Sequence, residues 1–261
     1  MFQNAAAMTL LVAGLLAGML VMLEAGRRIG IRRLARDPDG AMAGLGALEG
    51  AIFGLVGLLI AFTFSGAASR FDKRRDLIVE EANYIGTAYL RLDLLPASTQ
   101  PALRDCFRRY VDSRLAVYDA LPDVGAAKAK LAESNLVQTE IWRRAVEATK
   151  IAEINGNAVT SLVLSSLNEM IDITTTRTVA LQTHPPPSIF IMLGVLVLGA
   201  SLLAGHGMAR GKRRSSLHVL LFAVLMAGVI YIMLDFEHPR AGLIRVAAFD
   251  QVLVNVRESM K

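Results

Sequence analysis

Residues 44–76 read GLGALEGAIFGLVGLLIAFTFSGAASRFDKRRD, and this stretch sets the architecture of the chain. Between residues 41 and 69 the one charged side chain is Glu49. A helix needs about 20 mostly apolar residues to cross the hydrocarbon core of a bilayer, so the stretch predicts a membrane span. No proline follows before residue 96, and we therefore expect the helix to leave the membrane and continue to about residue 95 as one rod.

Three further apolar runs have the length of a membrane span. Residues 1–23 and 185–205 carry no charged side chain, and residues 215–234 carry no charge except on His218 if it is protonated. The first run does not resemble a secretory signal peptide, because its basic residues follow the apolar stretch instead of preceding it. The sequence therefore predicts an all-α integral membrane protein with four transmembrane helices.

The long segment between spans two and three has the pattern of amphipathic helices. Phe71, Ile78, Ile85 and Leu92 recur every seven residues, and similar stripes follow until three prolines at 185–187. Four such helices with short connections form a bundle, and its first helix continues span two. The expected domains are residues 1–69 with spans one and two, 70–187 with the extramembrane bundle, 188–235 with spans three and four, and 236–261 as a C-terminal tail.

The basic residues are concentrated in two short loops. Residues 26–41 and 206–216 together carry nine basic and two acidic side chains, whereas residues 70–187 carry fifteen of each. Basic loops between spans are typical of the cytoplasmic side of a membrane and do not indicate nucleic-acid binding. We therefore expect a multi-pass protein of a bacterial inner membrane, with the bundle and both termini in the periplasm. Arg70, Lys73, Arg74 and Arg75, directly after span two, argue for the opposite orientation.

Small residues recur along one face of span two. Close approach of helix backbones replaces the hydrophobic drive that is absent in lipid, so such a face predicts helix packing. The partner is either another span of the same chain or a second subunit arranged around an axis. The residues with this predicted packing role are Gly46, Gly50, Gly54, Gly57, Ala61 and Ser65.

Large apolar side chains occupy another face of span two. Phe53, Ile60 and Phe64 share this face, and in a symmetric oligomer they could form a hydrophobic constriction of the kind that gates a pore by dewetting. The alternative is that they contact lipid or pack in the core.

Several charged residues lie at the predicted membrane boundaries. Glu49 is close to the start of span two, and its expected role is either an acid at a pore mouth or an interfacial anchor near the positive end of the helix. Asp235, Glu237 and Arg240 crowd the end of span four and carry the same two alternatives.

The sequence gives no positive indication of catalysis. It contains no HExxH motif and no cysteine cluster, and its four histidines lack metal-ligand spacing. We therefore expect a protein that is not an enzyme and that has no cofactor and no metal site.

Two stretches resemble a known family. Residues 48–96, LEGAIFGLVGLLIAFTFSGAASRFDKRRDLIVEEANYIGTAYLRLDLLP, and residues 235–253, DFEHPRAGLIRVAAFDQVL, resemble the bestrophin-like domain family of bacterial membrane proteins. That family is remotely linked to the bestrophins, which are pentameric anion channels. The resemblance implies a second span that lines a pore and continues into a helical bundle.

The resemblance would place Phe53, Ile60 and Phe64 at a hydrophobic neck. It also implies a cytoplasmic bundle, contrary to the charge argument, and the calcium-binding acidic cluster of bestrophins has no clear counterpart in this sequence. The expected function is a homo-oligomeric channel-like protein that passes small ions, with the lipid bilayer and further copies of itself as partners. The alternative is a non-conducting scaffold or sensor whose bundle binds a partner or ligand.

Overall fold

A computed structural model of the chain describes residues 5–37, 45–121, 123–152, 157–210, 216–240, 242–244 and 246–260. Within these ranges every regular element is a helix, which confirms the predicted all-α fold. The elements are α1 (Ala5–Arg36), α2 (Leu45–Arg91), η1 (Leu92–Leu94), α3 (Gln100–Asp119), α4 (Val124–Ala152), α5 (Asn157–Gln182), α6 (Pro187–Gly207), η3 (Met208–Arg210), α7 (Ser216–Glu237), η4 (Ala247–Asp250) and α8 (Gln251–Ser259).

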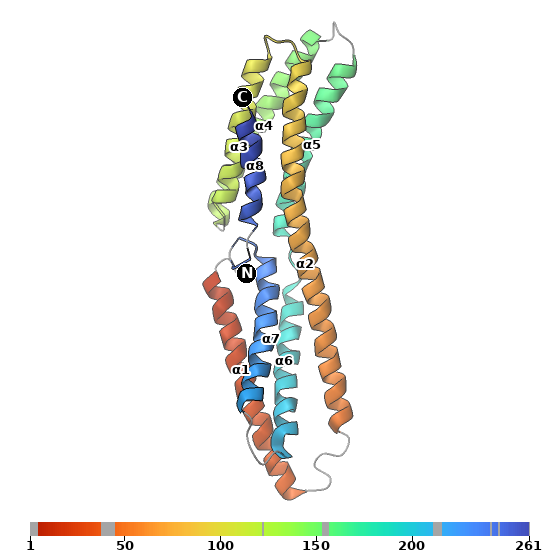
Figure 1. Cartoon of the computed structure of the whole chain (residues 1–261), viewed down its shortest axis with the longest axis vertical. Coiled ribbons are helices and arrows are strands. Elements are labelled where there is room, and N and C mark those ends of the chain that lie inside the picture. Colours follow the sequence, from red (N-terminus) through yellow and green to blue (C-terminus); the bar gives the residue numbers. More distant parts are fainter. Residues whose placement is uncertain are drawn as a thin grey trace. The chain divides into compact units, whose positions relative to one another are not determined.

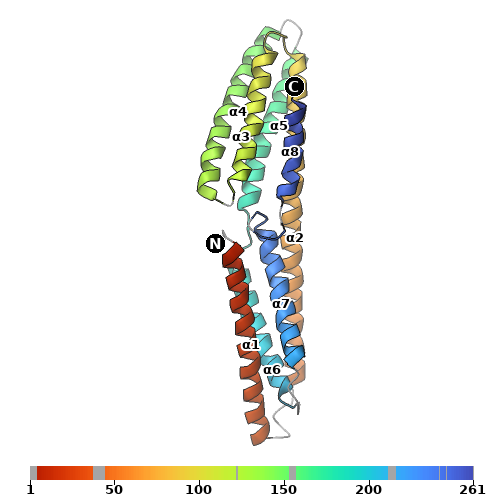
Figure 2. The same ribbon diagram turned by 60° about the vertical axis from the view of Figure 1, so that its left-hand side comes forward.

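The helices divide into two compact units (Figures 1 and 2). Unit 1 comprises Met1–Ser69 and His184–His238, and unit 2 comprises Arg70–Thr183 and Pro239–Lys261. Unit 1 thus contains α1, the first half of α2, α6 and α7. Unit 2 contains the second half of α2 together with α3, α4, α5 and α8. The sequence of each unit is discontinuous: residues 70–183 of unit 2 separate the two parts of unit 1, and residues 184–238 of unit 1 separate the two parts of unit 2.

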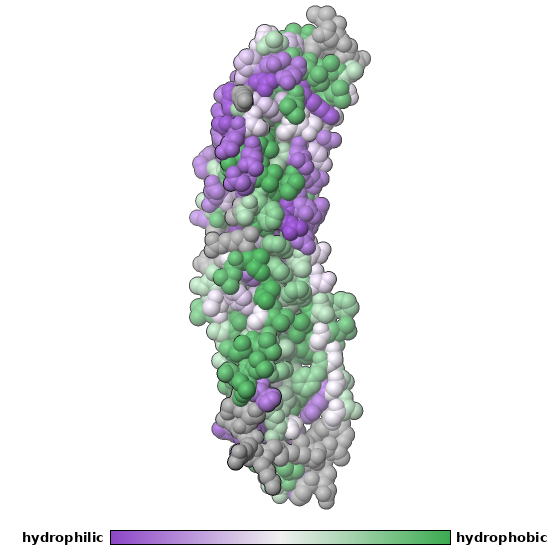
Figure 3. All heavy atoms as spheres, viewed as in Figure 1, coloured by the Kyte–Doolittle hydropathy of each residue, from purple (hydrophilic) through white to green (hydrophobic). Residues whose placement is uncertain are grey.

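Unit 1 is the membrane unit. Four helical stretches are long and apolar enough to cross a bilayer, namely Ala5–Arg36, Gly46–Leu94, Ala158–Gly207 and Leu217–Glu237. Each overlaps one of the four predicted spans. Helices suit this environment because they satisfy all their backbone hydrogen bonds internally, where no water is available. The helices of unit 1 expose mainly hydrophobic side chains, whereas hydrophilic ones are concentrated on unit 2 (Figure 3).

Helix α2 belongs to both units and is unbroken for 47 residues. At 1.5 Å per residue this corresponds to about 70 Å, more than twice the hydrocarbon thickness of a bilayer. The predicted continuity between span two and the first bundle helix is therefore confirmed.

Unit 2 is a bundle with an apolar core. The predicted stripes supply much of this core: Ile78, Ile85 and Leu92 of α2 and η1 are almost fully buried. Helix α3 packs against α4 and α4 against α5. Local signals fix the helix starts, because Pro101 occupies the first turn of α3 and the Asp123 carboxylate accepts hydrogen bonds from the first free amides of α4.

Two elements differ from the expectation. Residues 26–41 were expected to form a loop, but α1 continues to Arg36. Arginine is a good helix former, and the helix ends only where Pro38 disfavours helical geometry in the residue before it. The remainder of that loop, and residues 211–215 of the second basic loop, lie outside the described residues.

The C-terminal segment was expected to be a tail, but residues 251–259 form the short helix α8. It packs against α3 in unit 2. Leu253 and Met260 are buried in the bundle core, and Arg257 forms a two-point salt bridge with Asp112 at 2.7 and 3.0 Å. The segment after α7 is thus an integral part of the bundle.

Candidate functional site

The small residues of α2 lie on an exposed face of unit 1. All six of them, the α2 stripe, are exposed: Gly46, Gly50, Gly54, Gly57, Ala61 and Ser65. A Cβ atom built on any of its four glycines would meet no described neighbour within 4 Å. These four glycines therefore make no close contact with the other described spans of the same chain.

Close glycine packing within unit 1 occurs elsewhere, between α1 and α6. A Cβ atom on Gly26 would overlap the carbonyl group of Leu202, and one on Gly205 would overlap that of Leu23. One on Gly30 would come within 2.8 Å of the His206 carbonyl oxygen. We call these contacts the α1–α6 seam. Sequence reasoning missed it, although Gly26 and Gly30 have GxxxG spacing, because both glycines were assigned to a loop.

The large apolar residues of α2 lie beside the stripe, and the two phenylalanines among them contact α7. The ring of Phe53 meets that of Phe222 edge-on at a centroid distance of 6.4 Å, and the ring of Phe64 meets that of Phe236 at 5.7 Å. Ile60 is partly exposed and Phe64 is 38% exposed. These three side chains therefore border the exposed face of α2 and are partly covered by their own chain.

Glu49 lies near the end of α6. Its carboxylate oxygens are 3.4 and 3.5 Å from the position that a Cβ atom on Gly207 would occupy. The side chain is partly exposed. It is also in the first turns of α2, where the positive end of the helix stabilises a carboxylate. Both roles expected for Glu49, pore mouth and anchor, are compatible with this position.

The charged residues at the end of α7 are divided between the units. Asp235 and Glu237 belong to unit 1 and are 1% exposed, and Glu237 lies 3.5 Å from the Nδ1 atom of His184. Arg240 belongs to unit 2 and binds the Asp250 carboxylate at 2.8 and 3.0 Å. Burial and pairing are typical of structural anchors.

Unit 2 contains a buried ionic cluster that the sequence analysis did not predict. Glu81 of α2 is fully buried and accepts hydrogen bonds from Arg114 at 2.6 Å and from the Tyr118 hydroxyl at 2.8 Å. Arg177 of α5 donates to the second oxygen of the same carboxylate and also binds Asp250 at 3.2 Å. Removing one partner of a buried ion pair typically costs about 3–5 kcal/mol, so these groups tie α2, α3 and α5 to the segment after α7.

Tyr118 is at the centre of this cluster. The guanidinium of Arg177 lies 3.6 Å from the centroid of its ring, and those of Arg114 and Arg240 both lie 5.1 Å away. Cations over an aromatic face are attracted by its quadrupole, most strongly where water is excluded. Burial and the Glu81 carboxylate raise the pKa of Tyr118, so its hydroxyl stays protonated and donates to Glu81.

Groups that could hold a metal do not occur in the described ranges. Nowhere among these residues do three or more His, Cys, Asp or Glu side chains come together in a suitable arrangement. His184 and His238 stack with a centroid distance of 5.2 Å, and the Nδ1 atom of His238 lies 3.0 Å from the Leu234 carbonyl oxygen.

The fold is shared with solved membrane proteins. A bacterial bestrophin homologue from Klebsiella pneumoniae that carries a single substitution is similar with a TM-score of 0.64 and 15% identity, over 92% of this chain and 98% of that one. A second variant from the same organism has a TM-score of 0.65 and 14% identity, again over 92% of this chain and 98% of that one. A structure described as a membrane protein has a TM-score of 0.60 and 15% identity, over 94% of this chain and 97% of that one. At these identities the likeness shows a common fold.

The sequence itself identifies the family. None of the curated proteins compared with it matches. The model of the Bestrophin-like domain matches residues 19–248, a range that contains the first stretch on which the resemblance was based and most of the second. Together with four apolar helices able to span a membrane and one of them continuing into a bundle, this match confirms the predicted resemblance. The chain is a multi-pass membrane protein that belongs to the bestrophin-like domain family.

Proposed function

We propose that the protein is a homo-oligomeric channel-like membrane protein in which α2 lines a path for small ions. The observation that carries the proposal is the α2 stripe: six exposed small residues on a membrane helix, of which the four glycines have no described neighbour within 4 Å of an added Cβ atom. Small residues at helical spacing in lipid favour close backbone packing. A second copy of the chain is the partner that supplies this packing.

A ring of subunits would place α2 of each copy near a common axis. Phe53, Ile60 and Phe64 border the stripe and would then form the narrow, hydrophobic part of the path. The contacts of Phe53 and Phe64 with α7 would hold their rings in place. A pentamer is the arrangement that the resemblance to bestrophins implies.

The charged boundary residues divide into two groups. We propose Asp235, Glu237 and Arg240 as anchors, because they are buried or paired within their own units. Glu49 is partly exposed at the start of α2 and is the residue of this set that a passing ion could reach. We assign it to the mouth of the path.

Conduction is tested with purified oligomer in planar bilayers, comparing Phe64→Ala with Phe62→Ala. Phe62 is 68% exposed on the far side of the stripe, so it is a matched control on the same helix. We expect single-channel currents whose amplitude or open time changes in Phe64→Ala and stays unchanged in Phe62→Ala. Absence of current from well-folded wild-type and Phe64→Ala oligomers would contradict the proposal.

A silent oligomer would favour the second function, a non-conducting scaffold or sensor. In that case a pull-down from the native membrane should recover one stoichiometric partner protein. The proposed location is a bacterial inner membrane with the bundle and termini in the periplasm. A reporter fused after Lys261 checks the orientation, and reporter activity in the cytoplasm would reverse it.

A further inference from the structure

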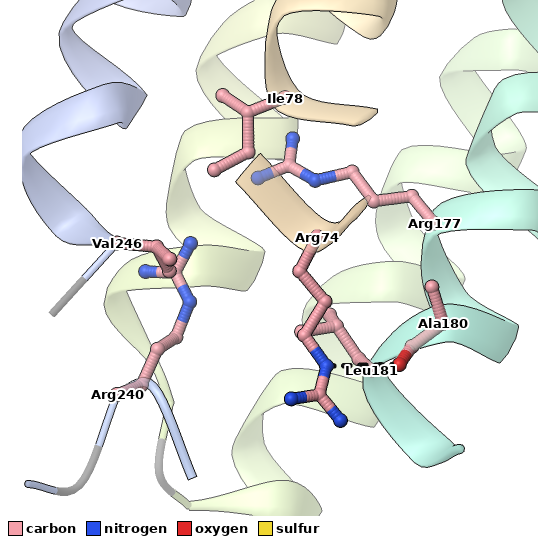
Figure 4. Close-up of a pocket in the computed structure, with 7 residues that line it drawn as sticks. All are labelled: Arg74, Ile78, Arg177, Ala180, Leu181, Arg240 and Val246. Carbon is pink, nitrogen blue, oxygen red and sulfur yellow. Dashed lines mark hydrogen bonds between the residues drawn. The ribbon is translucent and has the colours of Figure 1, made fainter. Parts of the chain in front are cut away.

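We propose that a small cavity in unit 2, beside Arg177 and Arg240, binds one monovalent anion of the size of chloride. The cavity has a volume of about 10 Å³. That is close to the room needed for a single water-sized ligand. Its described lining consists of Arg74, Ile78, Arg177, Ala180, Leu181, Arg240 and Val246, without an acidic side chain (Figure 4).

The charges around the cavity do not balance among the described residues. Arg114, Arg177 and Arg240 form salt bridges with two carboxylates, Glu81 and Asp250. Three guanidinium groups therefore share two negative charges. All five side chains are at least 86% buried, and an uncompensated buried charge is costly. One bound anion would neutralise the surplus.

A hydrogen-bond donor is available at this place. The Nε atom of Arg240 is buried and has no hydrogen-bond partner among the described residues, although its terminal nitrogens bind Asp250 and the Tyr118 carbonyl. Figure 4 shows the side chains of Arg177 and Arg240 reaching toward the same space from α5 and from the segment after α7. Arg74 adds positive charge to the lining and donates to the carbonyls of Ala180 and Thr183.

The size and lining of the cavity select the class of anion. A volume of about 10 Å³ suits an ion close in size to a water molecule. The remaining wall is apolar, formed by Ile78, Ala180, Leu181 and Val246. Such a wall offers few groups to replace a tightly held hydration shell, which disfavours fluoride relative to chloride or bromide. The site lies in the bundle and does not depend on whether the protein conducts.

Bromide provides a direct test, because it replaces chloride and is visible by anomalous diffraction. Crystals of the full chain grown in sodium bromide should show one anomalous peak in the cavity of each subunit, next to Arg240 Nε. Density without an anomalous signal would mean that the cavity holds water, and would overturn the proposal.

Thermal unfolding gives a second, independent readout. A ligand that binds the folded state raises the melting temperature with its concentration. We expect unit 2 to melt at higher temperature as sodium chloride increases, with no such rise in sodium gluconate of equal ionic strength. Arg240→Gln should abolish the chloride-specific rise. Arg257→Gln, which removes the same charge from the exposed pair with Asp112, should keep it.

Equal melting in chloride and gluconate would count against the site even if the variants behave normally. Should Arg240→Gln fail to fold, the bromide experiment on the unchanged protein still decides the question.

Discussion

The α1–α6 seam and the α2 stripe contain the same kind of residue and use it differently. In the seam, Gly26 and Gly205 allow two backbones of one chain to approach so closely that no Cβ atom fits. In the stripe, Gly50 and Gly54 have open space where a Cβ atom would be. The comparison teaches that glycine spacing marks a potential for close packing, and that the surroundings determine whether the same chain or another copy satisfies it.

The largest effect is expected when the seam is filled. Gly26→Ala and Gly205→Ala should each destabilise unit 1 by about 3 kcal/mol or more, because the added methyl group meets backbone that cannot rotate away. Thermal unfolding in detergent and the yield of monodisperse protein measure this loss. Wild-type stability in both variants would show that α1 and α6 can separate without cost.

Filling the stripe should affect association and spare the fold. Gly54→Leu adds a bulky side chain at a position with no described neighbour within 4 Å, so the monomer should unfold as the wild type does. The subunits should associate about a hundredfold more weakly, equivalent to about 2.7 kcal/mol. Light scattering over a dilution series in detergent follows this change. An unchanged oligomer would exclude the stripe from the interface.

Cysteine cross-linking locates the interface more directly. In a Cys106→Ser background, Gly54→Cys should form a disulfide-linked dimer under mild oxidation, whereas Val195→Cys on α6, which is 63% exposed, should remain monomeric on a gel. Equal cross-linking of both positions would indicate random collision in the detergent micelle.

Alkaline pH should act mainly on unit 2, which contains four of the five tyrosines, whereas unit 1 contains only Tyr231. Burial raises the pKa of Tyr110 in the bundle from 10.0 to about 12. The folded state thus favours the neutral phenol. Its contribution to the free energy of unfolding is therefore complete below pH 10 and is lost as the pH rises to about 12. This loss is about 2–3 kcal/mol, because each pKa unit corresponds to about 1.36 kcal/mol.

Circular dichroism and tyrosinate absorbance report this transition. In Tyr110→Phe the stability of unit 2 should decline less steeply between pH 10 and 12. The substitution should leave the surroundings intact, because Thr174 keeps its hydrogen bonds with Met170 and Gln138. An equally steep decline in the variant would assign the pH dependence to other groups, such as Tyr118.

The smallest effect is expected at Gly14, which is on α1 like Gly26 but has no described neighbour within 4 Å. Gly14→Ala should change stability by less than about 1 kcal/mol, in the stabilising direction, because alanine is the better helix former. A large loss in the melting temperature would reveal a contact at this position that the single subunit lacks.

Features encoded locally were predictable from the sequence. The length of each apolar run gave the four spans, and the lack of proline between residues 41 and 95 gave the continuous helix α2. Contacts between distant residues were not predictable in the same way. The seam was missed because arginines around Gly26 suggested a loop, although they are compatible with a helix that extends beyond the apolar region.

The ionic cluster of unit 2 was missed because its members come from four separate segments. One local signal was present: Arg114 lies between Val111 and Tyr118 on the predicted apolar stripe of α3, where a charge requires a buried partner. No spacing in the sequence identifies Glu81 or Arg177 as that partner. Likewise, the stripe on α2 was predicted as a packing face, but the open space beside its glycines among the described residues is a property of the fold.

The discontinuity of unit 2 has a consequence for how the protein is made. Helix α8 contributes Leu253 to a core whose other helices lie before residue 183, and two membrane spans, α6 and α7, separate them. A ribosome therefore releases α3, α4 and α5 well before the last helix that covers them. Until both later spans are inserted, the bundle exposes part of its apolar core, and this interval is when a chaperone or a protease would meet it.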